Sequence, residues 1–186
     1  KQSLVHDFAW FANPDFIVKL DSLTLPSGRT IQTSVFHLAK NAGIWTNSQE
    51  YLKKAILFHS AQAGEYPYNH VSVVEGKQGF SGGMEYPTIT ILDGAYDEKS
   101  LEGLIVHEVC HNWYYGILAS NERDHPWMDE GLNTYFDNRY ATPSNTREQE
   151  MEQLLYKTIA SIHRDQPIST SADKQYKWNY QAITYY

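Results

Sequence analysis

The amino-acid sequence predicts an α+β fold, in which a β-rich lobe with one helix spans residues 1–95 and a helical lobe spans residues 96–186. Three observations indicate this fold. Apolar and polar residues alternate over 15–25 and 30–38, which is the pattern of strands with one buried face. From Asp97 onward the apolar spacing changes to the helical period. The length of 186 residues suits a single well-buried domain better than several independent cores.

The β-rich lobe is expected to begin with two strands joined by a turn and to continue with a helix. Pro26-Ser27-Gly28 separates the two alternating segments and is typical of a turn. Asn47 or Ser48 can cap a helix over about 49–63, which Gly64 ends. The face that this helix packs against the core is expected to hold Leu52, Ala55, Ile56, His59 and Ala63.

Two extended segments follow this helix. Val71-Ser72-Val73-Val74-Glu75 predicts a strand, and residues 79–92 contain a second extended stretch. Gly82 and Gly83 lie in that stretch and allow another backbone to approach closely. A strand edge of this kind would suit a peptide ligand.

The second lobe is expected to be helical. Asp97 or Ser100 is the predicted N-cap of its first helix. After a loop over 120–125, a second helix is expected over about 126–140 and a third over about 146–163, and the rest of the chain is expected to be irregular. The face of the first helix is expected to hold Leu101, Leu104, Ile105, Glu108, Val109 and Trp113.

Composition argues against several classes of protein. The net charge is −7, from 22 acidic and 15 basic residues, and no long basic run is present, so no nucleic-acid partner is expected. No apolar run approaches the roughly 20 residues that cross a bilayer. The single cysteine, Cys110, lies in a helical pattern and is expected to be a small buried hydrophobe. The chain begins without Met and stops at Tyr186 in mid-element, so we expect it to be trimmed from a longer protein.

His107-Glu108-Val109-Cys110-His111 is an HExxH sequence on the first helix of the second lobe. Residues four apart share a helical face, so His107 and His111 can direct two imidazoles at one cation. Glu108 lies about 100° around the helix and can reach a water on that cation. Two imidazoles favour zinc, whereas magnesium and calcium prefer oxygen ligands. The motif therefore predicts one zinc ion per chain and a hydrolysis in which Glu108 deprotonates the attacking water.

Glu130 is the candidate for the third metal ligand. It lies in Trp127-Met128-Asp129-Glu130-Gly131, eighteen residues after His111, which is enough chain for a loop and an antiparallel helix to return a carboxylate to the metal. Three protein ligands leave the fourth position of a catalytic zinc site to water. A ligating imidazole also needs an acceptor for its other N–H group. Thr134 and Asp137 are candidates for that role, with a plain solvated helix position as the alternative for each.

Gly82-Gly83-Met84-Glu85-Tyr86-Pro87 precedes the HExxH sequence along the chain. It is similar to a Gly-x-Met-Glu-Asn signature, except that Tyr86 and Pro87 stand where that pattern has Asn. Together with HExxH, the eighteen-residue gap and Glu130, it resembles the M1 aminopeptidase family within the gluzincins. The similarity extends from about Asp7 to the C-terminal tyrosines.

The resemblance implies a zinc-dependent aminopeptidase with a thermolysin-like catalytic domain. Such a domain has a twisted, mostly antiparallel β-sheet lobe over a helical lobe, with the zinc site in the cleft. The resemblance also implies that Glu85 recognises the free α-amino group of a peptide substrate, which a fixed carboxylate can bind through a charge-assisted hydrogen bond. Gly82, Gly83 and Met84 would then bind the backbone of that peptide.

A tyrosine after the glutamate ligand hydrogen-bonds the oxyanion in the family. Tyr185 is the preferred candidate here and Tyr186 the alternative, since the family's tyrosine usually follows an apolar-x pair such as Ile183-Thr184. Family members also carry an N-terminal β domain and a C-terminal helical domain, which do not fit in this chain, so contacts with such flanking domains are expected.

Three other functions are compatible with these motifs. A thermolysin-like endopeptidase would use the same ligands without recognising an N-terminus. A relative that hydrolyses an epoxide and a catalytically inactive binding domain are the other two. Similar bacterial proteins suggest the periplasm, the envelope or the outside of the cell as the location, with the cytoplasm as the alternative.

Overall fold

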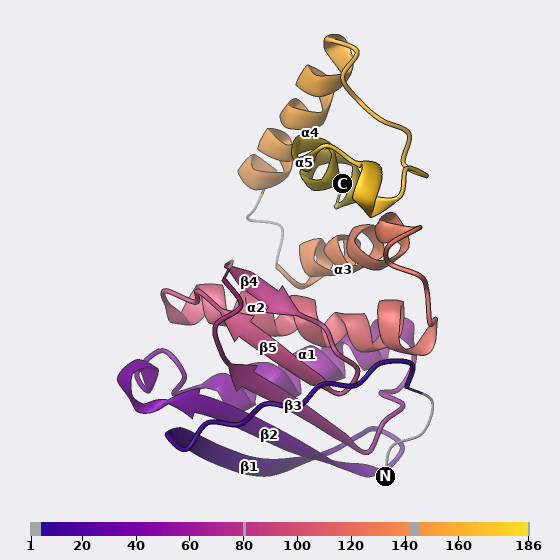
Figure 1. Ribbon diagram of the computed structural model, residues 1–186. Coiled ribbons are helices and arrows are strands. Elements are labelled where there is room, and N and C mark those ends of the chain that lie inside the picture. Colours follow the sequence, from indigo (N-terminus) through magenta and orange to yellow (C-terminus); the bar gives the residue numbers. More distant parts are fainter. Residues whose placement is uncertain (1–4, 80, 142–145, 186) are drawn as a thin grey trace. The chain divides into compact units, whose positions relative to one another are not determined.

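The computed structural model describes residues 5–79, 81–141 and 146–185 (Figure 1). The chain divides into two compact units, Lys1–Ile117 and Leu118–Tyr186. The first unit therefore includes the HExxH helix together with the β-sheet, whereas the sequence placed the boundary between lobes near residue 95. The second unit is helical.

The first unit contains a five-stranded sheet with the order β1-β2-β3-β5-β4. β1 pairs antiparallel with β2, and β4 with β5, whereas the β2–β3 and β3–β5 pairs are parallel. The expectation of a mostly antiparallel sheet is met only in part: two of the four pairs between the described strands are antiparallel and two are parallel, so the sheet is mixed. The cause is helix α1 (Ser48–Ala63), which carries the chain from the end of β2 back to the start of β3, as a parallel neighbour requires. The strands are β1 (Phe16–Thr24), β2 (Thr30–Leu38), β3 (His70–Glu75), β4 (Gly82–Met84) and β5 (Ile89–Asp93).

The segment 79–92, expected as one extended stretch, forms two strands. β4 and β5 run antiparallel, with Met84 opposite Ile91. The chain reverses between them in a turn closed by a 3.0 Å hydrogen bond from the Ile89 N–H to the Tyr86 carbonyl. β4 is the last strand in the order of the sheet, so the predicted strand edge is present at Gly82–Met84.

Helices α1 and α2 (Glu98–His111) pack against each other and against the sheet, α1 over β1 and β2 and α2 over β4 and β5 (Figure 1). Each fully buried leucine or isoleucine contributes about 1.5–3 kcal/mol to folding. The predicted face of α1 is confirmed except at its last residue, Ala63, which is exposed. The buried apolar residues at this interface are Leu52, Ala55 and Ile56 of α1 and Leu101, Ile105 and Val109 of α2.

The two ends of α2 are held in different ways. Asp97 is its N-cap: the Asp97 carboxylate accepts the Ser100 backbone N–H at 2.7 Å, and the Ser100 hydroxyl accepts the Asp97 N–H at 3.1 Å. This reciprocal pair satisfies free N–H groups of the first turn. The other end continues into a π-helical turn, Asn112–Ile117. Cys110 is buried, as its helical position predicts.

The second unit consists of helices of different lengths and helical turns. The segment after its longest helix, expected to be irregular, is partly helical, and Asn179 holds it. The Asn179 side chain donates to the Arg164 carbonyl at 2.8 Å and accepts the Gln166 N–H at 3.1 Å. The elements are a π-helical turn (Trp127–Gly131), α3 (Leu132–Tyr140), α4 (Thr146–Ser161), a 3₁₀ turn (Ala172–Lys174), α5 (Lys177–Asn179) and a second π-helical turn (Tyr180–Thr184).

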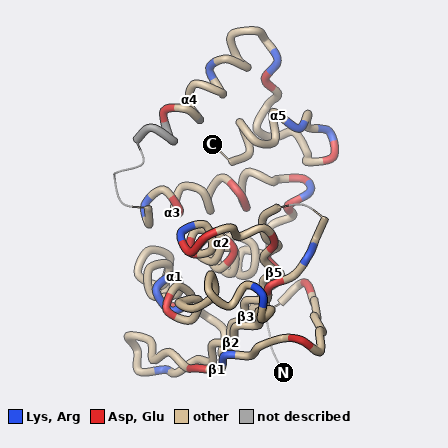
Figure 2. Tube along the Cα trace, turned by 90° about the vertical axis from the view of Figure 1, so that its left-hand side faces the viewer, with Lys and Arg blue, Asp and Glu red and all other residues tan. Residues whose placement is uncertain are grey.

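Two further expectations concern partners. Among the residues described, no helix combines the length and the apolarity needed to cross a bilayer. Lys and Arg are interspersed with Asp and Glu along the described chain (Figure 2). The expectation that nucleic acid is not a partner stays a prediction.

Candidate metal centre

The two histidines of the HExxH sequence converge at the C-terminal end of α2. Their Nε2 atoms lie 3.2 Å apart, and their ring planes are 83° to each other. Two imidazole nitrogens that each bind one zinc ion at about 2.0–2.1 Å, in tetrahedral geometry, lie about 3.3 Å apart. His111 is buried and His107 half-buried. The pair therefore has the spacing and the partial access that a bound zinc ion requires.

Glu108 lies directly against strand β4. The glutamate is buried, and a Cβ atom built on Gly83 would be 2.2 Å from Glu108 Oε1 and 2.3 Å from its Cδ. No side chain larger than hydrogen fits at residue 83 while the carboxylate keeps this place. The sequence singled out Gly83 for the approach of a peptide backbone, and the structure adds that Gly83 makes room for Glu108.

Glu85 follows β4 and is also buried, with 7% of its surface exposed. A carboxylate oxygen of Glu85 and a ring nitrogen of His111 lie within 4.8 Å of each other. The first unit thus brings together four residues that the sequence predicted for the site: Glu85, His107, Glu108 and His111. Because Gly82–Met84 form the edge strand beside them, the predicted substrate-binding residues belong to the same region.

The other predicted site residues belong to the second unit. Glu130 is the last residue but one of the π-helical turn Trp127–Gly131 and is half-buried. Thr134 and Asp137 follow it on α3. Thr134 is buried and Asp137 half-buried. The roles of these three residues toward the histidines stay predictions.

Tyr185 follows the second π-helical turn and is half-buried, with its ring 5.8 Å from that of Tyr180. The carbonyl oxygen of the preceding Thr184 would be 2.8 Å from a Cβ atom on Gly131. The π-helical turns Trp127–Gly131 and Tyr180–Thr184 therefore lie against each other within this unit. Glu130 and Tyr185 are the residues next to the contact between Gly131 and Thr184. Tyr186, the alternative to Tyr185, lies outside the described residues.

Asn112 is a buried polar residue that the sequence analysis missed. It follows His111 directly, and its Oδ1 atom accepts the Thr88 backbone N–H at 2.9 Å. Its Nδ2 atom donates to the Val109 carbonyl at 3.0 Å. The available signal was a polar residue between the second histidine and Trp113, which belongs to the predicted apolar face of the same helix.

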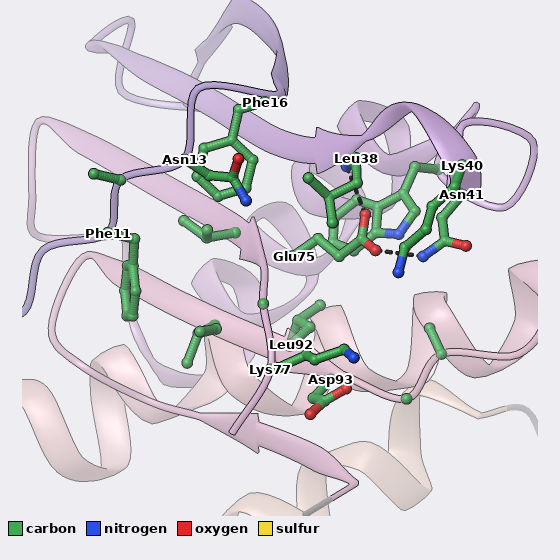
Figure 3. A pocket seen from close by; sticks show the side chains of 17 residues that line it. Phe11, Asn13, Phe16, Leu38, Lys40, Asn41, Glu75, Lys77, Leu92 and Asp93 are labelled. Carbon is green, nitrogen blue, oxygen red and sulfur yellow. Dashed lines mark hydrogen bonds between the residues drawn. The ribbon is translucent and has the colours of Figure 1, made fainter. Parts of the chain in front are cut away.

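A separate cavity of about 520 Å³ lies in the first unit, at the C-terminal ends of β2, β3 and β5 (Figure 3). At its wall the Glu75 carboxylate accepts the Leu38 backbone N–H at 2.7 Å and a hydrogen bond from the Asn41 side chain. Among the described residues that line it, none belongs to the predicted metal site. This cavity is therefore distinct from the HExxH region.

The converging histidines and the buried glutamate between them in sequence are the arrangement of metal-dependent peptidases. A family model described as the peptidase family M1 domain matches residues 48–186, which is more than half of the chain. The chain belongs to peptidase family M1.

Curated relatives match a short part of the chain. Leucine aminopeptidase 2 from Aspergillus clavatus is 32% identical over 65 residues, which are 34% of this chain and 10% of the relative. Human aminopeptidase B is 30% identical over 63 residues, which are 33% of this chain and 10% of the relative. The match thus covers about a tenth of the length of each of these relatives.

Solved structures match the fold over more of the chain. An M1 zinc metallopeptidase from Deinococcus radiodurans superposes with a TM-score of 0.69 at 15% identity, over 90% of this chain and 38% of that chain. Aminopeptidase A from Legionella pneumophila, in complex with aspartic acid, superposes with a TM-score of 0.56 at 15% identity, over 68% of this chain and 16% of that chain. At this identity the likeness concerns the fold alone.

Proposed function

We propose that this chain is the catalytic part of a zinc-dependent aminopeptidase that hydrolyses N-terminal residues from peptides. The observation that carries the proposal is the 3.2 Å approach of the His107 and His111 ring nitrogens, with the Glu108 carboxylate buried beside them. Membership of peptidase family M1 supports zinc as the metal. In this proposal one zinc ion per chain is held by His107, His111 and Glu130.

The residues of the site divide the reaction between them. A zinc ion held by these residues would supply Lewis-acid chemistry, lowering the pKa of a water and polarising the scissile carbonyl. Glu108 accepts the proton of the attacking water and then delivers it to the leaving amine. Because Glu108 is buried against Gly83, its carboxylate has little freedom to swing away from the water. The Tyr185 hydroxyl donates a hydrogen bond to the developing oxyanion.

Recognition of the substrate rests on Glu85 and on strand β4. The Glu85 carboxylate binds the ammonium group of the first residue, which only a true N-terminus offers. The backbone at Gly82, Gly83 and Met84 pairs with the peptide as an added strand. On the second unit, Thr134 and Asp137 accept hydrogen bonds from the ligating imidazoles and so fix the orientation of the rings.

The names of the curated relatives support an aminopeptidase over the alternatives, and one solved structure supports a peptide substrate. The curated relatives are named as aminopeptidases. A structure of the Deinococcus radiodurans protein is described as bound to a Tyr-Ser-Ala substrate, and it superposes with a TM-score of 0.66 at 17% identity. Because this chain covers 39% of that protein, contacts with flanking domains are part of the proposal. An endopeptidase, an epoxide-hydrolysing relative and an inactive binding domain are the outcomes that experiment has to exclude.

Replacement of the proposed base tests the mechanism. Glu108→Gln in the full-length protein should keep zinc bound, since Glu108 is not a ligand in the proposal, and should lose turnover of an aminoacyl peptide. Glu102→Gln on the same helix is the matched control and should keep turnover near that of the unchanged protein. Zinc content and kcat are measured side by side. Near-normal kcat in the zinc-loaded Glu108→Gln protein would refute the assignment.

A further inference from the structure

The turn that follows Glu85 has an unusual backbone. Tyr86-Pro87-Thr88-Ile89 is closed by the hydrogen bond from the Ile89 N–H to the Tyr86 carbonyl, and φ of Thr88 is +68°. Proline at the second position and a positive φ at the third are the features of a type II turn, in which glycine or asparagine is normally third. A β-branched residue with positive φ is strained, so this turn needs other interactions to hold it.

Thr88 is held through every polar group that it has. Its N–H donates to Asn112 Oδ1 at 2.9 Å, and its carbonyl accepts the Ser72 N–H at 2.8 Å. Its hydroxyl lies 3.1 Å from His70 Nε2. Thr88 is 5% exposed, so these hydrogen bonds lie away from bulk solvent, where losing one of them leaves a buried polar group unsatisfied.

Asn112 joins this turn to the metal-binding helix. It is the next residue after His111, it is 4% exposed, and it donates to the Val109 carbonyl of the same helix at 3.0 Å. The Tyr66 hydroxyl also lies 3.4 Å from Asn112 Oδ1. The Asn112 amide therefore connects the end of α2 to the strained turn Tyr86–Ile89, which begins directly after Glu85.

We propose that Asn112 is a positioning residue, which fixes the Glu85 carboxylate relative to the His107–His111 pair by clamping the turn at Thr88. This inference deepens the proposed function and rests on it, because it concerns the recognition of a free N-terminus. The clamp acts on the carboxylate that holds the substrate ammonium, while the metal ligands and Glu108 keep their own supports. Its loss therefore weakens substrate binding more than it slows the chemical step.

The test compares peptides with a free N-terminus and the same peptides N-acetylated, in the full-length protein. Asn112→Leu keeps a side chain of similar size and removes the acceptor of the Thr88 N–H. For the free peptides we expect KM to rise about tenfold or more, as for a lost hydrogen bond to a charged group, with kcat within about threefold. Zinc content and the slow turnover of the acetylated peptides should not change.

Two more variants separate positioning from general stability. Thr88→Gly relieves the strain at positive φ, so in the Asn112→Leu background it should bring KM for the free peptides back towards the starting value. Asn41→Leu is the matched control: it removes the side-chain hydrogen bond to Glu75 at the opposite ends of the parallel strands and should leave KM unchanged. If Asn112→Leu does not fold, Thr88→Val keeps the shape and loses only the hydroxyl contact with His70, and KM should rise less, by about threefold.

The outcomes distinguish the two levels of the proposal. Suppose that the unchanged protein prefers free peptides. If Asn112→Leu, or Thr88→Val where Asn112→Leu does not fold, then changes KM equally for free and acetylated peptides, or changes neither KM, the clamp is overturned and the proposed function stands. If the unchanged protein cleaves free and acetylated peptides equally well, the proposed function falls and the clamp falls with it.

Discussion

Replacing Gly83 with alanine is a small change with a calculable effect on catalysis. The new Cβ would be 2.2 Å from Glu108 Oε1, whereas ordinary van der Waals contact begins at 3.4 Å, so the carboxylate has to retreat by about 1.2 Å. A misplacement of about 1 Å can cost about 100-fold in rate. That factor corresponds to about 2.7 kcal/mol of transition-state stabilisation.

The assay for Gly83→Ala measures kcat on an aminoacyl peptide together with zinc content and melting temperature. We expect kcat to fall about 100-fold while zinc stays bound, because the histidines are not displaced by a methyl group on β4. Gly103→Ala is the matched control, since a Cβ at that exposed position of α2 meets open space. Alanine there should leave kcat unchanged and can raise the stability of the helix by up to about 1 kcal/mol.

The reasoning would be refuted by a Gly83→Ala protein that keeps zinc and retains kcat within about threefold of the starting value. Such a result would mean that Glu108 can leave its place against β4 at no cost to the reaction. A loss of zinc in this variant would also contradict it, because the steric effect would then have reached the ligands.

Three other outcomes follow from the same structure. A chelator should abolish turnover and lower the melting temperature, and added zinc should restore both, because a metal that binds only the folded chain stabilises it; unchanged turnover in the chelated protein would exclude a metallopeptidase. Glu85→Gln should raise KM for free peptides by about tenfold or more with zinc content unchanged, since the charge that pairs with the ammonium is lost; an unchanged KM would remove Glu85 from substrate recognition. Burial lowers the pKa of His70, so the folded chain takes up a proton there less readily than the unfolded chain. The stability that neutral His70 contributes is present above about pH 6.5 and is lost as the pH falls through the lower pKa of the folded chain. The melting temperature of the unchanged protein should therefore fall more steeply on acidification than that of His70→Gln. Parallel curves of melting temperature against pH for the two proteins would contradict this.

Local patterns predicted most of the elements of the first unit. The alternation over 30–38 matches the residues that β2 buries, and the helical spacing over about 49–63 matches most of the buried face of α1, so both can be read without knowing the neighbours. The strand expected over 15–25 is present as β1, but none of its residues is buried, so the expected buried face of that strand is wrong. The same holds for the HExxH histidines, since four residues of helix place their rings on one face whatever surrounds them. The cap at Asp97 followed from the short-range chemistry of a helix N-terminus.

Features that depend on distant residues were not predicted. The parallel pairing of β3 with β2 and β5 arises from the path of the chain through α1, which no strand pattern encodes. The helical turns after α4 depend on hydrogen bonds from Asn179. The role of Asn112 depends on a strained Thr88 that lies 24 residues away in sequence, and Pro87 alone did not indicate a positive φ at the next residue.

The most direct test of a zinc-dependent aminopeptidase is the hydrolysis of one peptide series, free and N-acetylated, by the full-length protein with and without a chelator. The account predicts turnover of the free peptides one residue at a time from the N-terminus, little turnover of the acetylated ones, and none of either after chelation. Cleavage at internal bonds of acetylated peptides, or hydrolysis that survives chelation, would contradict it.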